Sequence, residues 1–177
     1  MDPVPETPLG QTPEGLVPEG DGWFVVNIGD ARGRQSHKFG QAVRFAHDEA
    51  PFRGFGINVR LLQPRQPNCH YHRESKPEAF LVLDGECIAI IEDEERPMRK
   101  GDFFYAPPGT AHVIVGAGEA ACAVLMVGLR DEAEVVEYPV SETAARYGAS
   151  VQEHTDEPAV SYAGLDPPRP ARFPLPW

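Results

Sequence analysis

Three histidines and one glutamate stand in two short segments at spacings that suit metal binding. The first segment carries His70, His72 and Glu78, and the second, rich in glycine and proline, carries His112. His70 and His72 are two residues apart, so on a strand their side chains would share one face. Imidazole and carboxylate ligands without a thiolate argue against a closed structural zinc cage and suit Fe, Mn, Ni, Zn or Cu. These residues predict one divalent metal ion, with iron favoured.

The carboxylate ligand is open between Glu78 and its neighbour Glu74. We favour Glu78 because Pro77, just before it, biases the chain towards an extended conformation that leads into a strand. On that strand Glu78 would share a face with Phe80 and Val82, which would then point inward beside the metal.

Cys69 and the remaining histidines are not expected to bind the metal. Cys69 is adjacent to His70 and is expected to point away from the ligands. For His37, His47 and His154, outside both segments, we expect ordinary hydrogen-bonded roles.

Short β-branched and aromatic runs, broken by Gly, Pro or acidic turns, must position these ligands. They predict strands at 23–28, 55–63, 79–84, 86–91, 102–105, 112–115 and 120–127. Gly85 is expected to supply a positive φ in a tight turn, and the acidic run 92–95 is expected to be a solvated hairpin tip. Residues 141–147 predict one short helix, with Ser141 as its N-cap and Gly148 as its stop. The sequence thus indicates an all-β barrel or sandwich.

Both segments resemble the signature motifs of the cupin superfamily. The first motif is met by His70, His72, Glu78 and Gly85, with Pro64 in place of the leading glycine and five residues between His72 and Glu78 where three or four are usual. The second is met by Gly101, Pro107, Gly109 and His112, with Gly116 in place of the final asparagine. The resemblance spans about residues 55–128. It implies a single double-stranded β-helix, or jelly-roll, barrel over 21–138, with an extended arm at 1–20 and a short helix and proline-rich arm at 139–177.

The longer spacing also resembles the iron-binding core of 3-hydroxyanthranilate 3,4-dioxygenase. The matching residues are Pro67, Asn68, Tyr71, His72, Glu78, Phe80, Gly85, Gly101, Asp102, Phe103, Pro107 and His112. That family carries substrate-clamping arginines where this chain has Asn68 and Gly116. The resemblance therefore implies a related chemistry class with a different substrate.

Other residues are candidates for substrate binding and catalysis. Asn58 and Arg60 alternate with apolar residues on one strand face, which points either into the barrel or to solvent. With Phe80 and Phe103 they are the predicted substrate-binding residues. The predicted proton-transferring residues are Tyr71 and Tyr105.

The composition of the chain limits which partners and which cellular location we expect. A net charge of −11 without a concentrated basic face argues against nucleic acid. No apolar run approaches a membrane span, no secretory pattern opens the chain, and three cysteines without paired spacing fit reduced thiols, so we expect a cytoplasmic protein. Strands that are apolar on both faces, such as 79–83 and 120–127, need cover on both, which predicts a homodimer. The segment 172–177 carries two large aromatic residues, Phe173 and Trp177, and is expected to dock onto a protein surface, either its own or that of a partner subunit.

Three functions remain open. An oxygenase would use the open coordination positions of the metal for dioxygen and substrate. An isomerase, epimerase or lyase would pair the metal with a proton-transferring side chain. A binding or sensory barrel would hold a small molecule unchanged. We favour a metal-dependent enzyme of dioxygenase type acting on a small molecule.

Overall fold

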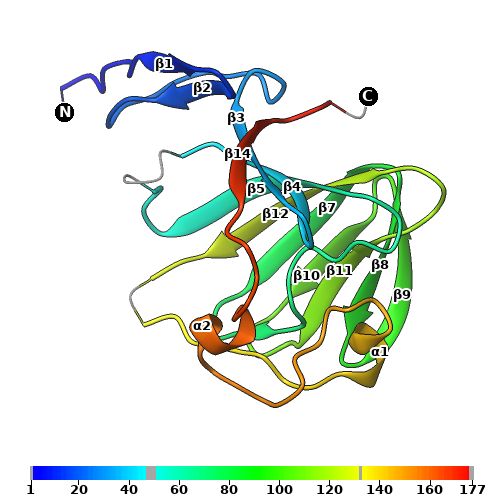
Figure 1. Cartoon of the computed structure of the whole chain (residues 1–177). Coiled ribbons are helices and arrows are strands. Elements are labelled where there is room, and N and C mark those ends of the chain that lie inside the picture. The colour runs from blue at the N-terminus through cyan, green and yellow to red at the C-terminus, as the bar shows by residue number, and fades with distance from the viewer. Residues whose placement is uncertain (1, 47–50, 132, 176–177) are drawn as a thin grey trace.

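The computed structural model describes residues 2–46, 51–131 and 133–175, and these form a mostly β structure (Figure 1). The strands are β1 Leu9–Thr12, β2 Gly15–Pro18, β3 Arg32–Ser36, β4 Gly40–Arg44, β5 Phe55–Leu62, β6 Arg73–Glu74, β7 Glu78–Asp84, β8 Glu86–Ile91, β9 Glu94–Arg99, β10 Phe103–Ala106, β11 His112–Gly116, β12 Cys122–Leu129, β13 Val136–Glu137 and β14 Arg169–Arg172. The helices are α1 Glu142–Ala145 and α2 Pro158–Ser161. The all-β expectation is confirmed.

Two antiparallel sheets form the barrel. The larger has the strand order β10-β7-β12-β5-β4-β3-β14, and the smaller has the order β11-β8-β9. The β1–β2 hairpin lies at one end of the molecule, away from α1 and α2 (Figure 1). The residues after β12 pass α1 and α2 and return to the larger sheet as β14. No helix of the described residues is long and apolar enough to cross a membrane.

The main core lies between the two sheets. Phe80 and Val82 of β7 are buried there, as expected for residues that share a strand face with Glu78. They pack with Cys87 of β8 and Cys122 of β12, both free and buried as small apolar side chains. Phe80 and Val82, which the sequence predicts to point into the barrel, are thus core residues.

A second apolar cluster covers the outer face of the larger sheet. Val59 and Leu61 of β5 and Ala123 of β12 pack there against Ala31 and Phe173. Phe173 is only 3% exposed, so the docking expected of it occurs on its own chain. The cover that motivated a homodimer is therefore supplied in part from within the chain, and the homodimer stays a prediction.

Two strands of the structure contain a proline, a residue that sequence patterns take as a sign against a strand. Residues 94–99 form β9 although Pro97 lies within it, and β14 contains Pro170. Both are edge strands, where a missing N–H need not interrupt a ladder. The predicted strand at 23–28 is wrong, since those residues make only an isolated bridge at Trp23.

The predicted turns and the α1 cap are confirmed. Gly85 has φ 74° between β7 and β8, and an added Cβ would lie 2.9 Å from the carbonyl oxygen of Ala121. Glu92 and Asp93 form the tip of the β8–β9 hairpin. The Ser141 hydroxyl accepts a hydrogen bond from the Ala144 amide at 2.9 Å. His47 and Trp177 lie outside the described residues.

Candidate metal centre

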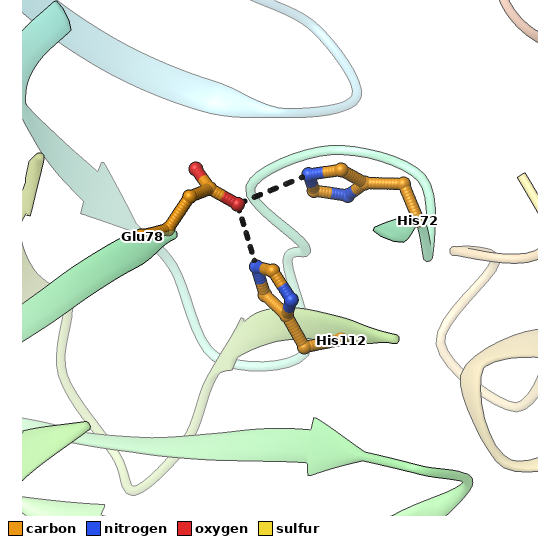
Figure 2. A group of neighbouring side chains, drawn as sticks. All are labelled: His72, Glu78 and His112. Carbon is orange, nitrogen blue, oxygen red and sulfur yellow. Dashed lines mark ion pairs between the residues drawn. The ribbon is translucent and has the colours of Figure 1, made fainter. Parts of the chain in front are cut away.

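The backbone brings His72 and His112 together before their side chains interact. The amide of His72 donates to the carbonyl of His112 at 3.1 Å, and the amide of His112 donates to the carbonyl of His72 at 2.8 Å. This isolated antiparallel bridge joins the segment before β6 to the start of β11. The two imidazole rings consequently lie with their centroids 4.9 Å apart. Glu78, the first residue of β7, extends its carboxylate towards both (Figure 2).

The three side chains present their donor atoms to one point. Glu78 Oε2 lies 3.0 Å from His112 Nε2 and 3.6 Å from His72 Nε2. One ligand atom from each residue lies within 4.8 Å of the others. Figure 2 shows the carboxylate facing both imidazole nitrogens.

The other ring nitrogen of each histidine fixes the tautomer. His72 Nδ1 lies 2.9 Å from the carbonyl oxygen of His70, and His112 Nδ1 lies 2.9 Å from that of Thr110. A carbonyl only accepts, so each neutral ring carries its proton on Nδ1 and turns the Nε2 lone pair towards Glu78. Backbone contacts of this kind orient metal-ligating histidines in proteins.

Two potential metal-ligating atoms, Glu78 Oε2 and His112 Nε2, are buried and face each other at 3.0 Å, but neither makes a well-formed hydrogen bond. Buried polar groups are normally satisfied, so such atoms indicate a missing partner. Two imidazoles and one carboxylate suit a divalent transition metal. The residues present therefore fit the metal that the sequence predicts.

The protonation of these side chains depends on whether a metal ion is bound. Burial opposes ionisation of Glu78, but the His112 and His72 imidazoles outweigh it and lower the pKa of Glu78 to about 2. Burial likewise opposes protonation of His72, but Cys69, Glu74 and Glu78 raise its pKa well above its usual range. Without a cation the site thus favours a carboxylate beside an imidazolium. A metal ion would replace that proton.

His70 does not join the cluster, contrary to the prediction. Its Nδ1 lies 3.0 Å from Ser161 Oγ, its Nε2 lies 2.7 Å from Lys38 Nζ, and its ring stacks on Tyr162. The alternation rule requires a regular strand, and residues 68–71 are bends and irregular backbone instead. His70 therefore anchors the segment that carries α2.

Glu74 remains close enough to compete as a ligand. Its Oε1 lies 3.5 Å from His72 Nε2, but only Glu78 lies within reach of both imidazoles. We expect the E78Q variant to lose bound metal and the E74Q variant to retain it, because an amide replaces a ligating carboxylate only in the first. Metal content per chain, measured on both variants side by side, checks this. Full metal in E78Q together with loss in E74Q would reverse the assignment.

A cavity of about 510 Å³ extends from the cluster into the barrel. Its lining includes Asn58, Arg60 and Phe80, three of the predicted substrate-binding residues. The polar face of β5 thus points inward, and the apolar face carrying Val59 packs outside. Cys69 also lines the cavity, so the expectation that it points away is wrong.

The predicted roles of Phe103, Tyr105 and Tyr71 are not supported. Phe103 and Tyr105 are 64% and 55% exposed, because strand alternation turns Phe104 inward against Phe80 instead. Tyr71 is buried in another apolar cluster, where its hydroxyl accepts a hydrogen bond from the Asp93 amide at 2.9 Å.

Several cavity residues that lie late in the chain could not be identified from sequence patterns. Tyr138, Tyr162, Arg130 and Glu134 all line the cavity or contact its lining. Tyr138 lies beside His72, with ring centroids 6.1 Å apart, and packs edge-on against Tyr162. These residues follow the predicted strands and belong to no motif. Tertiary packing alone brings them to the site.

The chain forms a small antiparallel barrel with two histidines and one glutamate beside an internal cavity. This combination is typical of a class of metal-binding barrels. Residues 59–128 match the family model described as cupin domain. This part of the chain is a cupin domain, which places the barrel in the cupin superfamily.

Two solved structures are similar to part of this chain. A protein from Acidithiobacillus ferrooxidans assigned as a sugar phosphate isomerase is 29% identical, with a TM-score of 0.50, over 56% of this chain and 65% of its own. A sugar phosphate isomerase from Silicibacter pomeroyi is 25% identical, with a TM-score of 0.49, over 62% of this chain and 66% of its own. The match thus spans just under two thirds of each of these relatives.

The fold also extends to more distant proteins. The polyketide cyclase RemF from Streptomyces resistomycificus is 15% identical, with a TM-score of 0.53, over 62% of this chain and 80% of its own. This likeness concerns the fold alone. A comparison with curated proteins gives no match.

Proposed function

We propose that this cupin is a metal-dependent enzyme that acts on a small polar molecule, with His72, Glu78 and His112 as metal ligands. The observation that carries the proposal is the fixed orientation of the two imidazoles. Backbone carbonyls hold both Nδ1 atoms, so both Nε2 atoms face the buried Glu78 carboxylate. Glu78 Oε2 and His112 Nε2 are both buried, and among the described residues they have polar contacts only within the cluster, which is the arrangement that a shared metal ion would complete.

The reaction class that we propose is proton transfer, as in an isomerase, epimerase or lyase. A bound divalent ion would polarise a carbonyl or hydroxyl oxygen of the substrate. Glu74 offers a second carboxylate beside His72. Burial and the neighbouring Glu74 raise the pKa of Glu134 to about 7, which suits a group that holds a proton near neutrality. Glu74 would remove a proton from the substrate, and Glu134 would hold or return it.

Two further observations support this class. The cavity contains Tyr138 and several charged side chains, so a polar substrate could be oriented there. The Acidithiobacillus ferrooxidans protein, 29% identical over the shared region, is itself assigned as a sugar phosphate isomerase. A sugar phosphate is thus the first substrate class to test.

A dioxygenase is the second candidate. Two histidines and one carboxylate are the ligand set of non-haem Fe(II) oxygenases, which leave positions open for dioxygen and substrate. Phe80 and Met126 would exclude water from part of that cavity. This candidate requires iron, whereas proton transfer does not.

Two assays on one preparation separate the candidates. The metal-free protein is loaded separately with Fe(II), Mn(II), Ni(II), Zn(II) or Cu(II), and each form is incubated in D₂O with a panel of sugar phosphates and 2-hydroxy acids. We expect metal-dependent deuterium incorporation at a substrate carbon, without oxygen consumption, and its loss in E74Q while metal is retained. Oxygen uptake confined to the iron form, without exchange, would support the dioxygenase instead. Neither reaction with any metal would contradict the proposed enzyme.

A further inference from the structure

The guanidinium of Arg60 lies in the barrel wall with little access to water. Its Nη1 donates to the carbonyl oxygen of Phe39 at 3.1 Å, and its Nε is buried without any hydrogen-bond partner. Arginine carries five donors and stays charged in proteins. Most of its hydrogen-bonding capacity is therefore unused among the described residues.

No carboxylate of the described residues balances this charge. Burial is the largest influence on Arg60 and lowers its pKa, and the nearby Arg44 lowers it further by repulsion. Buried charges in proteins are normally paired with an opposite charge. Arg130, another arginine that lines the cavity, does have such a partner, because its Nη1 lies 3.6 Å from Glu134 Oε2. The acidic residues facing the cavity are Glu74, Glu78, Glu134 and Asp166.

Strand register places Arg60 in the same sheet as Glu78, two strands away and four residues further along. Val82 of β7 pairs with Val124 of β12, which pairs with Arg60 of β5. Two strand spacings, about 10 Å, therefore separate β7, which begins with Glu78, from β5. In the row of Glu78 the partners on β12 and β5 are Gly128 and Gly56, and the Arg130 side chain lies over Gly56.

We propose that Arg60, assisted by Arg44 on the adjacent strand, binds an anionic phosphate or carboxylate group of the substrate while the metal centre holds the reacting end. This assignment rests on the proposed function for its biological meaning, but the anion site itself can be tested without metal. Arginine suits the role because its planar fork binds both kinds of oxyanion in two parallel hydrogen bonds. A substrate whose anionic group lies several bonds from its reacting atoms could reach both Arg60 and the metal ligands, since both line the same cavity.

The test uses the R60M variant and isothermal titration with inorganic phosphate and, separately, with acetate. The matched control is R99M, which removes the same charge from the exposed face of β9. We expect R60M to weaken binding of the preferred anion about 10- to 100-fold, and R99M to leave it unchanged. R60K keeps the charge but loses the fork, so it should fall in between. Stronger binding of phosphate than of acetate would identify the group as a phosphate, and the reverse as a carboxylate.

Each titration is repeated on metal-free protein and on H112A, so that the anion site and the metal site can fail separately. Equal anion affinity in R60M and wild type, or equal weakening in R99M, would overturn the Arg60 site. Binding that vanishes in H112A but survives in R60M would place the anion on the metal and also overturn it. Thermal unfolding of R60M shows whether the fold is intact. Should it unfold, R44M provides the second test, with a smaller expected loss and with unchanged affinity contradicting the proposal.

Discussion

The H112A variant is expected to purify with less than about a tenth of the metal of the wild type and to lose the proposed metal-dependent reaction. His112 supplies an Nε2 atom 3.0 Å from Glu78 Oε2, and alanine removes this ligand entirely. Altering a residue that merely supports a ligand already costs about 10- to 100-fold in affinity or activity, so removal of the ligand itself should cost more. Elemental analysis of protein purified without added chelator measures the metal content directly.

The fold of H112A should survive, because the core of the barrel does not depend on the metal. Val82, Ile114 and Val124 are buried between the two sheets, so most of the core remains when the His112 side chain is removed. The control is H154A, which removes an imidazole outside the cluster and should keep full metal. Full metal in H112A would refute the ligand set, and loss of cooperative unfolding would refute an independent core.

The largest effect on stability is expected from F80A. The Phe80 side chain is 2% exposed and packs on Phe104 and His112, with ring centroids 5.3 and 5.1 Å away. Removing a buried phenyl ring leaves a cavity and lowers the free energy of unfolding by about 3–5 kcal/mol. Against a total of about 5–15 kcal/mol for a typical domain, this is a large share. Chemical denaturation monitored by circular dichroism measures the difference.

F103A is the matched control for F80A. Phe103 lies on the neighbouring strand β10, but its side chain is 64% exposed. A substitution at such a surface position should change the free energy of unfolding by less than about 0.5 kcal/mol. Equal losses in the two variants would show that Phe80 is not a core residue of the protein in solution.

The sequence predicts the central strands well because two local signals coincide there. β-branched and aromatic runs end at turn residues that leave few alternatives, as at Gly85 with its positive φ. The 86–91 strand is observed with the predicted bounds. His72, Glu78 and His112 could be singled out because motif spacing and strand alternation agree for them. Where only alternation was available, as for Tyr105, the choice of face was wrong.

The remaining site residues depend on long-range packing that local patterns do not encode. His70 departs from the ligands because the backbone before β6 is irregular, so a two-residue spacing no longer means a shared face. Tyr138 and Tyr162 reach the cavity only because residues after β12 fold back across it. No periodicity marks such a segment. Its own anchors, such as the 3.0 Å contact between His70 Nδ1 and Ser161 Oγ, become visible only in three dimensions.

The prolines of the edge strands limit how two copies of this chain can associate. Pro97 lies in β9 at the edge of the smaller sheet, and Pro170 lies in β14 at the edge of the larger one. A proline on an edge removes a backbone donor and discourages strand addition from another molecule. Neither edge is thus suited to a continuous intermolecular sheet. Strand addition between two copies of the chain would therefore have to use the opposite edges, β10 or β11, which carry no proline.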